Sequence, residues 1–184
     1  MNSFHDLLIQ RHSIRKFTNQ PVDSEHVKLI LEAALMAPSS KRSMPWEFLV
    51  VEDKDVLRQI SKCRTMGTVA LNTCPLAIFV MADPQKSEAW VEDASIAAIL
   101  MQLQAEDLGL GSCWINIYGR FTADPEITSQ DYIREIIDIP GEQQILCIIA
   151  IGHKDEERKP FDLSRIKWEK VHIPTYSQTD NVTE

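Results

Sequence analysis

The chain has 184 residues, of which 44% are hydrophobic and 25% charged, and its formal net charge at pH 7 is -8. This length and apolar content allow roughly 70% of the unfolded surface to be buried, which predicts one globular domain over residues 1–184. The acidic balance disfavours nucleic acid and anionic membranes as partners. No window approaches the ~18 uninterrupted apolar residues of a membrane span and no secretory leader pattern is present, so we expect a cytoplasmic protein.

Two helices separated by a basic segment are predicted in the first forty residues. Ser3 can cap a helix over residues 4–10. A second helix opens at Asp23 or Ser24 and continues until Pro38, which also begins a loop. The basic segment therefore starts at the end of the first helix.

The basic segment reads R-H-S-I-R-K over residues 11–16. Arginine is the side chain best shaped to fork onto phosphate oxygens, and a serine hydroxyl adds a short neutral donor. In an acidic chain, such a cluster favours a small anionic ligand. A solvated basic loop is an equally good interpretation of this segment taken alone.

The middle of the chain predicts two buried strands and a long helix. Residues 46–51, apart from Glu47, and residues 76–81 are apolar, β-branched or aromatic runs, and Asp53 starts a short helix between them. A helix over residues 84–108 has no internal Gly or Pro and spans roughly 37 Å. Its apolar positions are so numerous that both sides of its middle are expected to be buried.

The last third predicts two more strands and an apolar tail. A glycine-led strand covers residues 111–117, and residues 119–130 form a polar loop, a candidate lid. A helix containing Ile133, Ile136 and Ile137 comes next. The last strand covers residues 144–151, and residues 154–160 form a charged excursion. The tail carries apolar side chains that need a surface to cover, and a partner subunit is one such surface: Trp168, Val171, Ile173 and Tyr176.

The cysteines give no metal or redox motif. Cys63, Cys74, Cys113 and Cys147 are widely spaced, with no C-x-x-C pair and no His/Cys cluster. A zinc site or a dithiol centre needs such clustering. We therefore expect no metal ligand and interpret the four thiols as buried and reduced, since free cysteine behaves as a small hydrophobe.

Four short motifs follow one another along the chain. They are R-H-S-x-R at residues 11–15, A-P-S-S at 37–40 with P-W at 45–46, G-L-G-S-C-W at 109–114, and I-G at 151–152 followed by Arg158 and Lys159. This combination, together with the order of predicted helices and strands, resembles the FMN-dependent nitroreductase family over nearly the whole chain. No Rossmann G-x-G-x-x-G motif is present.

The resemblance implies an α+β fold in which helices flank a central, antiparallel-rich mixed sheet. It also implies a homodimer with two FMN sites at the subunit interface and an exchanged C-terminal arm over about residues 160–184. The implied activity transfers hydride from NADH or NADPH through flavin N5 to small electrophiles such as nitroaromatics or quinones, with ping-pong kinetics. No side chain is expected to act as a nucleophile.

The resemblance also assigns roles within the basic segment. Arg11 and Ser13 match phosphate and ribityl ligands, and His12 matches a backbone or ribityl neighbour. Arg15 matches the cation near the flavin pyrimidine edge. A fixed guanidinium there would stabilise the negative charge of reduced flavin and raise its potential, so Arg15 is expected to tune the flavin.

The loop after the second helix is expected to reach the flavin of the other subunit. Pro38, Ser39 and Ser40 resemble that family segment. Arg42 and Met44 stand where many relatives carry Asn and Gln that bind the flavin ring. Arg42 could add charge over the flavin, turn outward to an anionic substrate, or remain a solvated loop residue.

The remaining assignments lie in the second half of the chain. Gly111 and Ser112 match a loop whose backbone approaches the isoalloxazine, and a glycine there avoids a clash between Cβ and the ring. The second basic phosphate contact is Arg158 or Lys159, with Arg165 as another candidate in sequence reach.

Two other functions remain open. The same scaffold supports specialised flavin chemistry, such as reductive dehalogenation or flavin breakdown. A non-catalytic flavin-binding dimer is the other alternative, and the departures at Arg42 and Met44 are the features that leave it open.

Overall fold

A four-stranded sheet forms the centre of the protein in a computed structural model that describes residues 3–140 and 142–174. The strands are β1 (Trp46–Val51), β2 (Leu76–Ala82), β3 (Gly111–Asn116) and β4 (Gln144–Gly152). Their order across the sheet is β1-β2-β4-β3, and every neighbouring pair is antiparallel. The predicted α+β class is confirmed.

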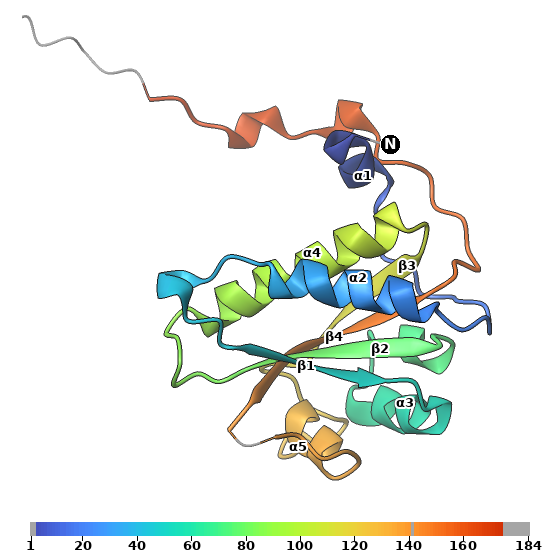
Figure 1. The fold of residues 1–184 in the computed structure, drawn as a ribbon, viewed down its shortest axis with the longest axis vertical. Helices are drawn as coiled ribbons and strands as arrows, with labels where there is room; N and C mark the ends of the chain where they lie inside the picture. The colour runs from blue at the N-terminus through green and yellow to red at the C-terminus, as the bar shows by residue number, and fades with distance from the viewer. Residues whose placement is uncertain (1–2, 141, 175–184) are drawn as a thin grey trace, which may run out of the picture.

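Helices cover both faces of this sheet (Figure 1). α2 (Ser24–Leu35) and α4 (Trp90–Asp107) lie on one face, whereas α3 (Lys54–Ile60) and α5 (Ser129–Arg134) lie on the other. α1 (Phe4–Gln10) precedes these layers. Short 3-10 helices occur at Ser40–Arg42, Ser61–Cys63, Val69–Asn72, Leu163–Arg165 and Trp168–Lys170.

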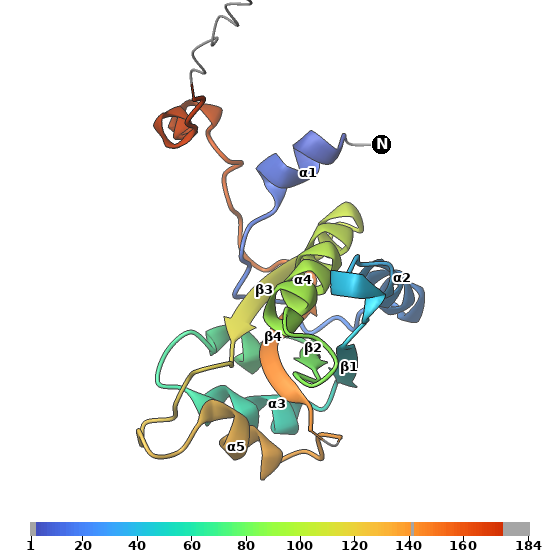
Figure 2. The same ribbon diagram turned by 90° about the vertical axis from the view of Figure 1, so that its left-hand side faces the viewer.

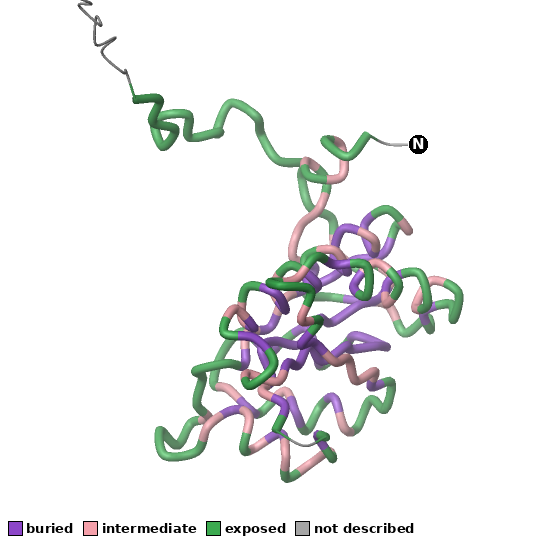
Figure 3. The backbone as a smooth tube through the Cα atoms, turned by 60° about the vertical axis from the view of Figure 1, so that its left-hand side comes forward, coloured by how far each residue is buried: buried purple, intermediate pink, exposed green. Residues whose placement is uncertain are grey.

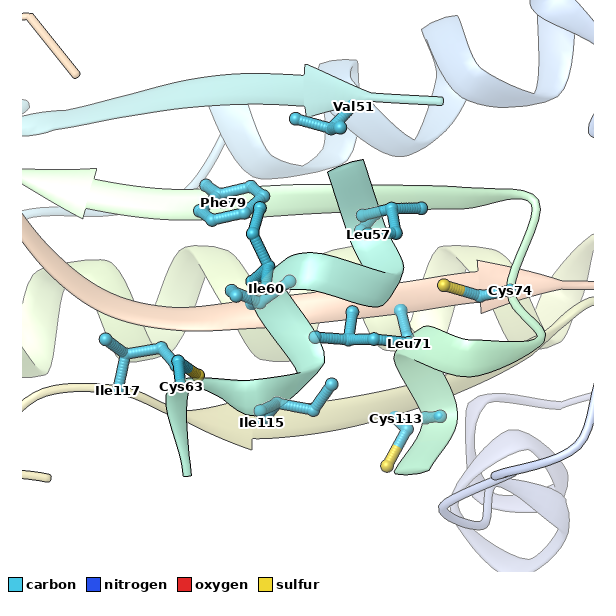
Figure 4. Close-up of a cluster of buried hydrophobic side chains, with 14 of the residues drawn as sticks. Val51, Leu57, Ile60, Cys63, Leu71, Cys74, Phe79, Cys113, Ile115 and Ile117 are labelled. Carbon is cyan, nitrogen blue, oxygen red and sulfur yellow. The ribbon is translucent and has the colours of Figure 1, made fainter. Parts of the chain in front are cut away.

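Each face of the sheet has its own apolar core, and β2 contributes to both. The core below the sheet includes Leu57 and Ile60 of α3 packed against Phe79 of β2 (Figure 4). The core above the sheet lies under α2 and α4. All four cysteines are unpaired and buried in these cores, as predicted. A strand buried on both faces explains the uninterrupted apolar run at residues 76–82.

The predicted helix starts rest on side-chain caps that the structure contains. Ser3 makes a capping box with Asp6 at the start of α1. Asp23 and Asp53 accept backbone N–H bonds at the starts of α2 and α3. The predicted beginnings of these three helices are therefore confirmed.

The long helix is shorter than predicted. α4 begins at Trp90 rather than at Pro84, because Asp83 makes a turn instead of a helix cap. The backbone N–H of Lys86 donates to the Asp83 carbonyl, and that of Gln85 donates to its carboxylate. The helix is thus about 27 Å long at 1.5 Å per residue.

The second side of α4 is not covered within one chain. Ala94, Ala97 and Met101 are fully buried, but Ile96 and Ile99 are 37% and 40% exposed. The prediction that both sides of the helix middle are buried therefore does not hold for the single chain. Apolar positions on the outer side need a further surface to be covered.

The predicted helix around Ile133 is also shorter than expected. α5 ends at Arg134, so Ile136 and Ile137 lie in the turns that follow it. They still pack against the lower core. The prediction placed these residues in the helix because their apolar spacing continues that of α5. The exact end of a helix is hard to locate from such spacing.

α1 and the C-terminal segment extend away from the layered body (Figures 2 and 3). The backbone N–H of Phe161 donates to the Ile9 carbonyl, which joins the two at their bases. Trp168 and Ile173 are 70% and 87% exposed. Tyr176, which was predicted to share this role, lies outside the described residues. None of the described helices is long and apolar enough to cross a membrane.

Candidate functional site

The basic segment is fixed by main-chain pairing with the sheet. Ser13 forms a parallel bridge with Ser112 of β3, and the Ile14 N–H donates to the Ser112 carbonyl at 2.9 Å. Phe17 pairs with Lys154, just beyond β4. Ile14 and Phe17 are buried. The chain therefore holds residues 11–17 against the sheet and leaves the polar side chains of the segment to face outward.

Two glycines allow this close approach. A Cβ on Gly111 would lie 2.9 Å from the Ile14 side chain, and a Cβ on Gly152 would lie 2.6 Å from Pro75. Both distances are shorter than real Cβ contacts. We expected Gly111 to make room for a flavin ring. The structure gives it a different steric requirement, which is to admit Ile14.

A cavity of about 700 Å³ opens beside the basic segment. Gln10 and Ile14 line it together with residues 154–158. Binding sites for small molecules and cofactors commonly have volumes of this order. Arg158 lines the cavity, which favours it over Lys159 and Arg165 as the second basic contact.

Carboxylates organise the cations of this cavity. Glu156 accepts hydrogen bonds from the backbone N–H of Arg15 and from the Arg158 guanidinium, the latter at 2.7 Å. The Arg15 N–H is the main cause that lowers the pKa of Glu156, and the charge of Arg158 lowers it further. Lys154 pairs with the buried Glu106 of α4 at 2.6 Å.

The underside of the basic segment is apolar. Burial raises the pKa of the Cys113 thiol on β3, while the positive charges of Arg15 and Arg11 oppose that effect. The thiol therefore stays protonated and neutral at pH 7.

His12 carries a buried nitrogen that lacks a partner. Among residues 3–140 and 142–174, no group forms a hydrogen bond with its Nε2 atom. An unsatisfied buried polar atom costs stability, so such atoms are commonly completed by a ligand, water or another chain. A polar cofactor would supply a partner for this orphaned group; Arg11, His12 and Arg15 adjoin the cavity in the chain, although Ile14 is the residue among 11–15 that lines it.

The serine-containing loop forms a second polar region. Lys41, Arg42 and Met44 have positive φ angles of 52°, 56° and 44°. The Ser39 hydroxyl accepts the Met44 N–H at 3.0 Å, and the Ser40 N–H donates to Asp93 at 2.7 Å. The loop is thus held in a rare backbone conformation by side-chain acceptors.

The remaining loop residues lie at its surface. Pro38, Ser40, Lys41, Arg42 and Met44 are exposed, and Ser39 is half-buried. A cavity of about 330 Å³ separates the loop from the turn at residues 84–89. The side chain of Arg42 is therefore free to reach a ligand or a second chain.

The two polar regions lie at opposite ends of α4 (Figure 1). The loop contacts Asp93 in the first turn of the helix, whereas Lys154 in the cavity contacts Glu106 near its end. These two helix positions are about 20 Å apart at 1.5 Å per residue. The structure thus brings residues 11–15, 111–112 and 158 together but does not bring the loop of residues 38–44 to them within one chain.

Sequence reasoning missed the carboxylates that order both regions. Asp93, Glu106 and Glu156 were not singled out, yet each accepts a hydrogen bond from one of these regions. A signal was present for Asp93. It follows Trp90 by three residues and precedes Ala94 and Ala97, so it lies on the buried stripe, where an acidic residue is rare unless paired.

An antiparallel sheet between two helical layers, with a phosphate-type basic segment paired to its edge strand, defines an α+β class of cofactor-binding protein. The sequence model of the Nitroreductase family matches residues 8–67 and 62–153. The chain therefore belongs to the nitroreductase family, and the predicted resemblance is confirmed.

Similar proteins agree with this membership. A solved structure titled "FMN-dependent Nitroreductase" from Clostridium difficile R20291 is 46% identical, with a TM-score of 0.88; the match covers 94% of this chain and 99% of that one. FMN reductase [NAD(P)H] of Bacillus subtilis is 28% identical over 100% of this chain and 78% of its own length. 5,6-Dimethylbenzimidazole synthase of Rhodospirillum rubrum is 24% identical, covering 89% of this chain and 88% of that protein.

Proposed function

We propose that the protein is an FMN-dependent NAD(P)H oxidoreductase that reduces small electrophiles such as nitroaromatics or quinones by a ping-pong mechanism. The observation that carries this proposal is the pairing of Ser13 with Ser112, which assembles residues 11–15 beside a cavity of about 700 Å³. FMN reductase and FMN-dependent nitroreductase among the similar proteins support the cofactor and the co-substrate.

The basic segment supplies the residues that would hold FMN. Arg11 and Arg158 would bind the phosphate by charge-assisted hydrogen bonds, with Ser13 and His12 toward the ribityl chain. Arg15 would hold positive charge beside the pyrimidine edge. When bound, FMN supplies the centre that accepts and delivers hydride. The protein's own residues bind, orient and exclude water around it.

We infer that the complete site forms between two copies of the chain. The loop of residues 38–44 lies at the opposite end of α4 from residues 11–15, so a second copy is needed to unite them. Two-fold pairing is the commonest way to join two different regions of identical chains, and it creates two equivalent sites. Pro38, Ser39, Ser40, Arg42 and Met44 would then contact the flavin of the partner subunit.

Exposed apolar surface supports this homodimer. The patch comprises side chains of α1, α2 and α4: Phe4, Leu8, Leu29, Leu35, Met36, Ile96 and Ile99. A groove of about 270 Å³ between the same helices has Phe4, Leu7 and Leu100 in its walls. Apolar patches of this kind mark interaction sites. The segment from about residue 160 onward would serve as an arm that covers part of the partner, with Trp168 as its largest apolar side chain.

Reconstitution with FMN tests the activity. Purified protein loaded with FMN should lose its oxidised flavin absorbance under excess NADH or NADPH without oxygen, and a quinone or nitroaromatic should restore it. Steady-state rates at several acceptor concentrations should give parallel double-reciprocal lines. A flavin that stays oxidised under excess of both nucleotides would overturn the proposal.

Flavin breakdown, which the family resemblance left open, stays the second candidate, and one similar protein is named as a synthase and not as a reductase. Incubation of the reduced protein with and without oxygen, followed by mass analysis of the flavin, separates the two activities. Intact FMN after many aerobic turnovers supports the oxidoreductase. Oxygen-dependent loss of FMN mass supports the alternative.

We also expect a cytoplasmic location, because four unpaired buried thiols suit a reducing compartment.

A further inference from the structure

Asp93 is a buried carboxylate that joins the serine-containing loop to the helix behind it. The residue is 3% exposed and lies in the first turn of α4. Its oxygens accept the Ser40 N–H at 2.7 Å, the Ser87 hydroxyl at 2.8 Å and the Ser43 hydroxyl at 3.5 Å. A carboxylate removed from water needs such donors, because its desolvation is costly when its oxygens are unpaired.

The loop needs an external restraint to keep its shape. Lys41, Arg42 and Met44 all have left-handed backbone angles, which disfavour side chains with a Cβ. Their side chains are exposed, so packing does not hold them. Two backbone bonds turn the segment, from the Arg42 N–H to Ser39 and from the Ser43 N–H to Ser40, and the bonds to the Ser39 hydroxyl and to Asp93 fix its ends. Strained backbone persists only when surrounding contacts over-determine it.

We propose that Asp93 is a positioning residue that holds the loop of residues 39–44, with its left-handed Lys41, Arg42 and Met44, in shape and thereby sets the contacts of this loop with flavin. The inference rests on the proposed function. Since the loop is remote from residues 11–15 of its own chain, Asp93 acts on the cofactor site of the partner subunit. It is an acceptor for the loop and does not itself touch the cofactor.

Hydrogen exchange in the cofactor-free protein tests the positioning directly. In Asp93→Ala, the amides of Ser40 and Met44 should exchange about tenfold faster, as expected from loss of one hydrogen bond of ordinary strength. Asp93→Asn keeps an acceptor for the Ser40 N–H and should retain most of the protection. Glu92→Ala removes an exposed carboxylate from the same helix turn and is the matched control, which should exchange like the wild type.

Flavin measurements test the consequence for the site. Asp93→Ala should weaken FMN binding at least about tenfold and shift the visible circular dichroism of the bound flavin, whereas Glu92→Ala should change neither. A purely structural role for Asp93 would lower stability and leave the spectrum of the bound flavin unchanged. That result would overturn the proposal.

Mixed dimers test action on the partner's site. When Arg11→Ala and Asp93→Ala chains are co-expressed with different tags, the hybrid dimer has one site with both defects and one site with neither. One FMN per hybrid dimer should bind with wild-type affinity. If Asp93 acts within its own chain, every site carries one defect and no tight site appears.

If Asp93→Ala does not fold, Ser87→Ala still tests whether Asp93 holds the loop. Ser87→Ala removes one donor from the carboxylate and also the acceptor of the Ala89 N–H at the start of α4, and it should raise exchange at Ser40 about threefold. Unchanged exchange at Ser40 in Ser87→Ala, with unchanged FMN affinity, overturns the inference. If the wild type does not bind FMN, the proposed function fails, while the exchange data still decide whether Asp93 holds the loop.

Discussion

The two ends of α4 are ordered by different means. At one end, residues 11–17 are held by backbone pairing to Ser112 and Lys154, and Ile14 and Phe17 are buried beneath them. At the other end, residues 39–44 are turned by two backbone bonds within the loop and are joined to α4 by the side-chain acceptor Asp93, with Ser39 as a second side-chain acceptor. A segment anchored by main chain tolerates changes in its outward side chains, whereas a loop anchored by side chains depends on a few atoms. Residues 11–17 should therefore be sensitive to changes that disturb the backbone, and residues 39–44 to the loss of single side-chain acceptors.

Among the predicted effects, the largest is that of Gly111→Ala on the backbone pairing of residues 11–17 with the sheet. Its new Cβ would lie 2.9 Å from the stiff, β-branched Ile14, so the basic segment must shift. We expect a loss of stability of about 1–3 kcal/mol, measured by urea unfolding, together with weaker FMN binding. Adding Ile14→Ala removes two of the three contacted carbons, Cγ1 and Cγ2, and should recover part of the FMN affinity, while the Cβ of residue 14 stays in contact. Additive losses would contradict the steric explanation.

Side-chain changes on the anchored segment should affect the ligand and not the fold. Arg11→Ala is expected to weaken FMN binding by about 2 kcal/mol, since a phosphate loses a charged hydrogen-bond partner. Fluorescence quenching of FMN measures this affinity. Lys16→Ala removes an equal charge from an exposed neighbour and should have little effect. Equal losses of FMN affinity in the two variants would indicate that the overall positive charge of the segment binds FMN, and not a specific contact with Arg11.

Arg15→Ala should alter the flavin more than its binding. Loss of the cation disfavours the anionic reduced form, and about 1.4 kcal/mol of lost stabilisation lowers a two-electron potential by about 30 mV. Equilibration with a reference dye under reducing conditions measures the midpoint. Arg15→Lys keeps the charge and should retain most of the potential. A midpoint equal to that of wild type in Arg15→Ala would reject the tuning role.

The smallest expected effect is a gain in stability when the left-handed Lys41 of the loop is replaced by glycine. Lys41 has a φ of 52°, so Lys41→Gly relieves the left-handed strain and should raise the free energy of unfolding by about 0.5–1 kcal/mol despite the greater freedom of glycine. Lys41→Ala removes the same charge but keeps a Cβ and should give no gain. Stabilisation by both variants would point to charge and not to backbone strain.

Local rules predicted much of the fold because they act over a few residues. Ser3, Asp23 and Asp53 accept nearby N–H groups, so each helix start could be located from the sequence. The strand at residues 76–82 is apolar throughout because both of its faces are buried. The start of α4 was misplaced because Asp-Pro can begin either a turn or a helix, and here Asp83 makes a turn with Gln85 and Lys86.

The candidate site was less accessible to sequence reasoning. The basic segment and the serine loop could be named from motifs, but the distance between them depends on the length and direction of α4. The requirement for glycine at 111 comes from Ile14, ninety-seven positions earlier in the chain, which no local pattern reveals. Partnerships over such sequence separations are properties of the fold and not of a short motif.

The four buried thiols should react little with thiol-specific labels, so a cysteine introduced elsewhere can be labelled selectively. Burial raises the pKa of Cys63 to about 11 and that of Cys74 to about 12, and it also raises the pKa of Cys113 and Cys147. Maleimides react with thiolates, so the native protein should be inert to them near neutral pH. A single cysteine introduced at Lys167 on the C-terminal segment would then carry a fluorophore at one defined place. Its signal would test whether that segment moves onto a second subunit, as we propose.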